Sequence, residues 1–223
     1  MSRGLFVTGT GTDVGKTFVT ALLLKKLRES IDAVYYKAAL SGAEMIGGRL
    51  TAGDAYYVCR TAGITGEPND NVSYIYEHPL SPHLAARLEG RSVEAERIRA
   101  DFDALCAAHE FVVAEGSGGI VCPIRFDEER IMLTDIIKML GLDIVIVSAA
   151  ALGSINSTVL TCEYARSLGI GVRGFILNRY DGSDIMQSDN LRMIEALTGA
   201  PVIAYAEANG SELVFLRDIR ELL

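Results

Sequence analysis

One feature restricts the fold of this chain more than any other: the glycine-rich run Gly9–Thr17 (GTGTDVGKT). It follows a short apolar run, Leu5–Thr8, and precedes a stretch with apolar residues at helical spacing, Lys16–Arg28. A strand, a glycine-rich loop ending in Gly-Lys-Thr and a helix form the context in which a phosphate-binding loop is expected. The loop is one residue longer than the common pattern, because five residues rather than four separate Gly9 from Gly15.

The residues of this loop have the chemistry that a nucleoside triphosphate requires. Glycines allow successive backbone N–H groups to face one anion, and the start of a helix adds partial positive charge there. The Lys16 ammonium can reach the β- and γ-phosphates, and the Thr17 hydroxyl can ligate Mg²⁺. The predicted nucleotide-binding residues of the loop are Gly11, Thr12, Asp13, Val14, Gly15, Lys16 and Thr17. A glycine-rich strand-to-helix turn that binds nothing is the alternative.

Strand-like apolar runs alternate with helical stretches along the rest of the chain. Strands are expected at Ala33–Lys37, Phe111–Glu115, Ile144–Ser148, Val172–Asn178 and Pro201–Tyr205. Helices are expected at Asp54–Ala62, from a capping Thr134 to Gly141, at Ser154–Leu168 and at Asp184–Leu197. Fully apolar strands that alternate with helices indicate a parallel sheet covered on both faces.

The predicted fold class is therefore α/β: a three-layer α/β/α P-loop NTPase-like fold with a mainly parallel central sheet. The less regular segment from about Gly63 to Arg99 contains three of the five prolines and is expected to pack on the same sheet as one insertion. No repeat or convincing linker divides the chain, so we predict a single domain over residues 1–223.

Composition and charge exclude several classes of protein. Hydrophobic residue types make up 49% of the chain and charged types 22%, which is typical of a folded globular protein rather than a disordered or collagen-like one. The net charge of −8 disfavours binding to the polyphosphate backbone of nucleic acids. No apolar run approaches the roughly 18 residues of a membrane span. Four cysteines without C-x-x-C spacing indicate reduced thiols, so we expect a cytoplasmic protein that binds neither nucleic acid nor membrane.

Three charged residues stand at predicted element ends, where open α/β sheets bind their ligands. Lys37 and Glu115 close strands, and Asp54 begins a helix. A metal ion bound by Thr17 and phosphate oxygens requires one or two carboxylates, so the predicted Mg²⁺ ligands are Thr17, Asp54 and Glu115. The alternatives are an ordinary helix cap or a solvated loop for each acid, and a strand-end lysine that points into water for Lys37. Because Lys37 stands where a dinucleotide-binding fold needs an acid, that fold is rejected.

Taken together, these motifs resemble the dethiobiotin synthetase family over most of the chain. Beyond the loop, the motifs that carry the resemblance are Tyr36-Lys37 with Ser41-Gly42, Asp54, Ser81-Pro82-His83, Glu115–Gly119, Leu152–Asn156 and Asn178. The resemblance implies ATP- and Mg²⁺-dependent closure of a ureido ring on 7,8-diaminononanoate with CO₂, in biotin synthesis. A substrate amine would become a carbamate, whose oxygen would attack the γ-phosphate to give a carbamic–phosphoric anhydride. The second amine would then close the ring and expel phosphate.

The resemblance also implies a role for each matching residue. The implied catalytic residues are Thr12, Lys16, Lys37 and Ser41, of which Lys37 and Ser41 would meet the carbamate and the transferring phosphoryl group. The ends of the diamine would be bound at Gly118, Gly153, Ser154, Ile155 and Asn156, across a homodimer interface. Asn178 would hydrogen-bond the nucleotide base, with an ordinary strand-end turn residue as the alternative. His83 is expected to be structural, because Pro82 at a helix start is sufficient reason for its segment.

The sequence departs from the family pattern at three places. Ala38 follows Lys37 where the family usually has proline, and Ser117 replaces the usual alanine of the glutamate-glycine segment. Residues 205–207 (Tyr-Ala-Glu) stand where the base-binding loop commonly has a hydrophobic-proline pair.

Three other functions were weighed against this one. The nearest is a P-loop ATPase switch of the plasmid-partition or septum-site type, without ligase chemistry. Such switches carry an additional lysine near the start of the loop, where this chain has only Thr and Gly at residues 8–11. An amide-forming ligase of cobalamin synthesis would need a glutaminase domain, for which 223 residues leave no room. A nucleotide-binding scaffold without chemistry is supported only by Ala38.

Overall fold

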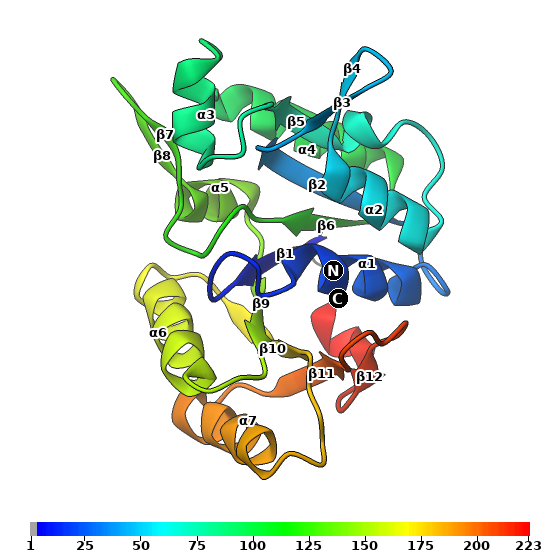
Figure 1. Cartoon of the computed structure of the whole chain (residues 1–223), viewed down its shortest axis with the longest axis vertical. Helices are drawn as coiled ribbons and strands as arrows, with labels where there is room; N and C mark the ends of the chain where they lie inside the picture. Colours follow the sequence, from blue (N-terminus) through cyan, green and yellow to red (C-terminus); the bar gives the residue numbers. More distant parts are fainter. Residues whose placement is uncertain (1–3) are drawn as a thin grey trace.

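The centre of the molecule, in a computed structural model that describes residues 4–223, is a sheet of eight strands (Figure 1). The first three residues of the domain predicted over 1–223 lie outside the described residues. In spatial order the strands are β12 (Val214–Phe215), β11 (Val202–Ala206), β10 (Val172–Asn178), β9 (Ile144–Ala149), β1 (Gly4–Gly9), β6 (Phe111–Glu115), β2 (Ala33–Leu40) and β5 (Val72–Ile75). Neighbouring strands run parallel from β11 to β5, whereas β12 pairs with β11 antiparallel.

Helices cover both faces of this sheet. The first face carries α1 (Lys16–Leu27), α2 (Gly53–Ala62) and a short 3₁₀ helix (Ile219–Leu222). The second face carries α4 (Ala95–Ala108), α5 (Leu133–Leu140), α6 (Ser154–Ser167) and α7 (Ile185–Thr198). Strand residues alternate between the two cores: Leu5 and Val7 of β1 pack toward the first face, and Phe6 packs toward the second. The predicted three-layer α/β/α fold is confirmed.

The segment between α2 and α4 contributes to the same sheet. A 3₁₀ turn (Pro68–Asn71) leads into β5, which pairs with β2, and α3 (Pro82–Leu88) follows. Two antiparallel hairpins lie outside the main sheet: β3 (Glu44–Ile46) with β4 (Arg49–Thr51), and β7 (Pro123–Phe126) with β8 (Arg130–Met132). Sequence reasoning predicted neither hairpin, and it did not predict β5, α4 or β12; of α3 it predicted the helix start at Pro82. Within residues 4–223, no helix has the length and apolar character needed to span a membrane.

Most predicted boundaries agree with the structure to within one or two residues, and two details are wrong. Strand β2 continues past Lys37 to Leu40, so Lys37 lies inside the strand rather than at its end. Thr134 does not cap α5, because the helix already begins at Leu133 and Thr134 lies buried in its first turn. The Asp135 carboxylate accepts a hydrogen bond from the Met132 backbone N–H at 2.8 Å, which satisfies one of the N–H groups at this helix start.

Candidate active site

The phosphate loop joins the carboxyl end of β1 to the start of α1 at the middle of the sheet. Its conformation depends on residues with left-handed backbone: Gly15 has φ 95° and Asp13 has φ 60°. A Cβ atom at Gly15 would lie 1.9 Å from Nδ2 of Asn178, so glycine is required there on both steric and conformational grounds. The Lys16 ammonium turns back over the loop and donates to the Gly11 carbonyl at 2.8 Å.

Asn178, at the end of β10, stabilises the phosphate loop by a hydrogen bond. Its Nδ2 group donates to the Val14 carbonyl at 3.0 Å, and its Oδ1 accepts from the backbone N–H of Arg179 at 3.0 Å. The side chain is only 3% exposed. Asn178 therefore links the phosphate loop to the strand-end backbone of β10, and its predicted contact with a nucleotide base stays a prediction.

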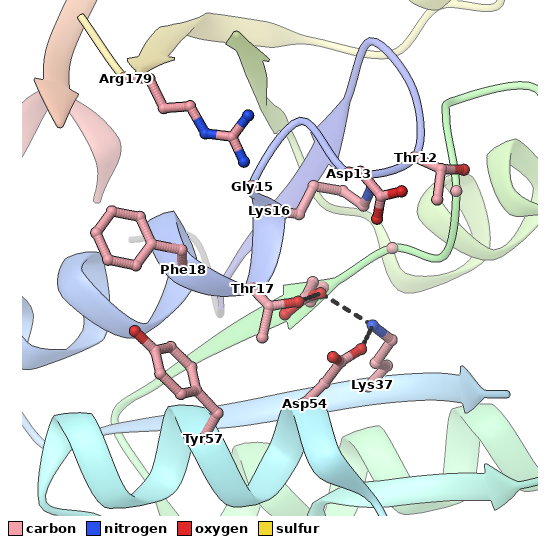
Figure 2. A pocket seen from close by; sticks show the side chains of 13 residues that line it. Thr12, Asp13, Gly15, Lys16, Thr17, Phe18, Lys37, Asp54, Tyr57 and Arg179 are labelled. Carbon is pink, nitrogen blue, oxygen red and sulfur yellow. Dashed lines mark hydrogen bonds and ion pairs between the residues drawn. The ribbon is translucent and has the colours of Figure 1, made fainter. Parts of the chain in front are cut away.

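Facing the loop is a cluster of charged groups centred on the buried Glu115. The Thr17 hydroxyl donates to Oε1 of Glu115 at 2.8 Å, and the Lys37 ammonium donates to the same oxygen at 2.9 Å. Lys37 also donates to Oδ2 of Asp54 at 2.5 Å, as the dashed lines in Figure 2 show. The Tyr35 hydroxyl donates to the other oxygen of Glu115, Oε2, at 3.0 Å. The structure thus brings together five side chains from four elements: α1, β2, α2 and β6.

Strand register explains why these groups meet. Lys37 of β2 lies directly beside Glu115 of β6 in the parallel pairing, and Tyr35 lies two residues earlier on the same face of β2. Asp54 reaches them from the first turn of α2. Tyr35 is a site residue that sequence reasoning missed, although its two-residue spacing from Lys37 was a usable signal.

Burial and neighbouring charges shift the pKa values of this cluster. Burial lowers the pKa of the Lys16 ammonium, and the Glu115 carboxylate opposes that shift. Burial alone would lower the pKa of Lys37 as well, but Glu115 and Asp54 raise it above its ordinary value, so Lys37 is held as a cation. Burial, reinforced by Glu115, raises the pKa of Tyr35 well above its ordinary value, so its hydroxyl remains a donor.

The same oxygens suit a magnesium ion. Thr17, Asp54 and Glu115 offer a hydroxyl and two carboxylates, which are the hard oxygen donors that Mg²⁺ prefers beside phosphate oxygens. Thr17 and Lys37 both contact Oε1 of Glu115, and Lys37 also contacts Asp54, so the three predicted ligands lie close together, with the Lys37 ammonium between the two carboxylates. Among the described residues no group of three His, Cys, Asp or Glu side chains forms a metal site, so a metal here would depend on Thr17 and on phosphate.

Two cavities meet at the phosphate loop. The first, of about 590 Å³, is lined by the charged cluster, by Lys16 and by Tyr57 and Arg179, which sequence reasoning did not single out. The second, of about 900 Å³, is lined by Ser41, by residues 79–82 and by residues 117–123 apart from Ile120. Thr12, Asp13 and Gly118 line both, so the two spaces adjoin at the tip of the loop.

A third and smaller cavity, of about 260 Å³, lies on the other side of Gly15. It is lined by Gly15, Phe18, Asn178, Arg179, Glu207 and Asn209. The predicted site residue Asn178 therefore lies beside an open space, as does Glu207, one residue of the 205–207 departure from the family pattern.

Four predicted substrate-binding residues lie apart from these spaces. Gly153 precedes α6, and Ser154, Ile155 and Asn156 form its first turn. Within residues 4–223, the linings of the first and second cavities include none of them. His83, which was expected to be structural, lies in the first turn of α3 and lines neither cavity.

Comparison with known proteins gives consistent results. Residues 3–210 match a family described as an AAA domain. A curated protein of Clostridium botulinum strain Eklund 17B, named "ATP-dependent dethiobiotin synthetase BioD", is 48% identical over 222 residues, covering 99% of this chain and 98% of the relative. A protein of the same name from strain Alaska E43 is 52% identical over 203 residues, covering 91% and 89%.

Solved structures with the same fold are more distant in sequence. A ParA family ATPase from Chlorobium tepidum has a TM-score of 0.55 at 14% identity, covering 92% of this chain and 84% of its own. The septum site-determining protein MinD of Pyrococcus horikoshii, complexed with Mg-ADP, has a TM-score of 0.56 at 18% identity, covering 93% and 82%. At such identities the likeness concerns the fold alone.

Proposed function

The chain belongs to the ATP-dependent dethiobiotin synthetase family, and from that membership we propose how the residues of the two large cavities divide the reaction between them. The activity is that of a ligase that makes dethiobiotin at the expense of ATP. The proposal assigns the triphosphate to the first cavity and 7,8-diaminononanoate, carrying CO₂ as a carbamate, to the second. The observation that carries it is the junction of the two spaces at Thr12, Asp13 and Gly118.

In the first cavity, the residues of this chain act by position and charge. Backbone N–H groups of the loop and the Lys16 ammonium hold the terminal phosphates. Lys37, already cationic, stabilises the negative charge that moves to the bridging oxygen as the carbamate oxygen attacks the γ-phosphorus and the bond to ADP breaks. Phosphoryl transfer of this kind needs no protein nucleophile, and Ser41 at the rim of the second cavity is placed to orient the carbamate.

We further propose that Thr17, Asp54 and Glu115 hold Mg²⁺ beside the phosphates. When bound, the ion supplies charge neutralisation at the β- and γ-phosphate oxygens. The Tyr35 hydroxyl donates to Oε2 of Glu115, and Thr17 donates to Oε1, so Tyr35 helps to hold the carboxylate in place beside Thr17.

The second amine of the substrate closes the ring by attacking the carbamate carbon, which releases phosphate and a proton. Because its lining is uncharged apart from Asp13, the second cavity can admit an extended aliphatic chain beside the phosphate loop. The start of α6 lines neither space of its own chain, which is what a contribution to the substrate site of a second copy would require. We therefore propose a homodimer in which Gly153–Asn156 of one protomer completes the site of its partner.

A cytoplasmic location is part of this proposal. It is supported by Cys59, Cys122 and Cys162, which are buried as free thiols in the structure.

The proposal is tested by following ADP release with ATP, Mg²⁺ and bicarbonate, in the presence and absence of the diamine. The expected result is diamine-dependent ADP release with one ureido product formed per ADP. ADP release that the diamine does not change, with no ureido product, would contradict the ligase assignment and favour a nucleotide switch.

A further inference from the structure

Arg179 is the first residue after β10 and has an unusual backbone. Its φ is 59°, in the left-handed region that a bulky side chain rarely adopts. Such conformations persist where the surrounding structure enforces them, and they concentrate at ligand-binding sites. The position therefore requires an explanation beyond chain reversal, which glycine or asparagine would achieve with less strain.

Hydrogen bonds on both sides fix this backbone. Arg179 donates its N–H to Oδ1 of Asn178 at 3.0 Å, and Asn178 in turn holds the Val14 carbonyl of the phosphate loop at 3.0 Å. The next residue, Tyr180, donates its N–H to the Ala206 carbonyl at 2.9 Å. The direction of the Arg179 side chain is consequently set by the same bonds that set the shape of the loop.

The side chain points toward the phosphate loop. Figure 2 shows the Arg179 guanidinium beside Gly15, on the side of the loop opposite Lys37 and Asp54. It is exposed, and among the described residues no carboxylate forms an ion pair with it, although acidic residues outnumber basic ones in the chain by 29 to 21. An exposed guanidinium without an ion-pair partner keeps its N–H donors available to bind an anion.

The cavities show where such an anion would lie. Gly15, Phe18 and Arg179 line both the first and the third cavity. We place the terminal phosphates of a nucleotide at Lys16 and Thr17 and its base in the third cavity. Its α-phosphate and ribose then lie beside the residues that the two cavities share. Among the described residues that line both cavities, Arg179 is the cation beside the α-phosphate and ribose.

We propose that Arg179 binds the nucleotide at its α-phosphate, and that its left-handed backbone serves to aim the guanidinium there. The inference rests on the proposed placement of the triphosphate in the first cavity. It adds to the phosphate loop a second, independent anion-binding group that belongs to the end of β10.

The test compares Arg179→Gly with Arg192→Gly, a matched removal of an exposed arginine on α7. Titration calorimetry with ADP and Mg²⁺ is expected to give roughly tenfold weaker binding for Arg179→Gly, since a charge-assisted hydrogen bond is lost. Arg192→Gly should bind as the parent chain does. Because glycine accepts the left-handed conformation, the Tm of nucleotide-free Arg179→Gly should equal or exceed that of the parent chain, which separates a binding role from a structural one.

Competition by AMP and adenosine identifies the contacted group. We expect Arg179→Gly to lose the same factor for AMP as for ADP, with less than a twofold change for adenosine. Unchanged ADP affinity, an equal loss for adenosine, or a lowered Tm would each overturn the assignment to the α-phosphate. If the parent chain itself bound no ADP, the proposed function would fail together with this inference, whereas normal parent binding with an unaffected variant would reject Arg179 alone.

Discussion

The two large cavities at the phosphate loop are neighbours with opposite character. The first is walled by the carboxylates of Asp13, Asp54 and Glu115 and by the cationic groups of Lys16, Lys37 and Arg179. The second is walled by threonine, serine, glycine, proline, leucine, valine and one cysteine, and Asp13, which both spaces share, is its single charged side chain within the described residues. Charged groups are therefore concentrated in the first cavity, where a phosphoryl group would be transferred. The second cavity would recognise its substrate mainly by shape.

The largest effect is expected for Lys16→Ala, which removes a cation from the first cavity. Loss of the ammonium leaves the terminal phosphates without their closest cation, so we expect diamine-dependent ADP release to fall by roughly a thousandfold. The measurement is the single-turnover rate, with circular dichroism to show that the variant folds. Lys25→Ala, an exposed lysine of the same helix, is the matched control and should retain the parent rate. A Lys16 variant within a few-fold of the parent chain would remove the charged cavity from the chemistry.

The next largest effect is expected for Lys37→Met, measured as stability rather than activity. Removal of the ammonium leaves the buried Glu115 without its cationic partner, which should lower the free energy of unfolding in metal-free buffer by about 3 kcal/mol. Urea unfolding gives this number, and added Mg²⁺ should narrow the gap because the cation replaces the lost charge.

The pH dependence of that gap follows from the raised pKa of Lys37. A raised lysine pKa contributes stability that is fully present below the pKa of the unfolded chain and is lost only as pH rises through the folded value. The gap should therefore stay constant from about pH 6 to pH 9. A gap that closes across this range would contradict a cationic Lys37.

Glu115→Gln tests whether the charge of one carboxylate in the first cavity is needed for magnesium binding. Glutamine retains the shape of the side chain and one oxygen that can accept a hydrogen bond, but it removes the charge that a metal ion needs. The Mg²⁺ concentration for half-maximal activity should rise by roughly thirtyfold. An unchanged magnesium titration would exclude Glu115 from the metal site.

The smallest effect is expected for a substitution in the second cavity. Ser81 is exposed, lines the second cavity and forms no side-chain cap bond at the start of α3, so Ser81→Leu fills space without breaking a contact in the structure. The KM for the diamine should rise by roughly tenfold while the KM for ATP stays unchanged. Equal changes in both constants would show that the two cavities do not hold separate substrates.

Sequence reasoning succeeded where the determining residues are local or lie at predicted strand ends. The phosphate loop is contiguous, so its chemistry was visible without a fold. Lys37 and Glu115 are 78 residues apart, yet neighbouring strands of a parallel sheet present them together. The sequence predicted that both lie near the ligand, whereas their mutual contact came from the strand order in the structure. Their roles in catalysis remain predictions, as does the single domain.

The rest depended on side-chain direction and on packing. Tyr35 looks like one more apolar strand residue until its hydroxyl is seen to meet Glu115. Arg179 follows a predicted strand, but no pattern shows that its backbone turns left-handed or that its side chain faces the loop. Thr134 was the better capping residue by type, and the helix nevertheless begins at Leu133 because β8 delivers the chain into it directly.

Both borders of the central sheet are formed by short strands: two residues in β12 on one side and four in β5 on the other. Short borders offer few free backbone groups on which another sheet could continue. The proposed homodimer should accordingly form through helices and loops, without extending the sheet from one molecule into the next.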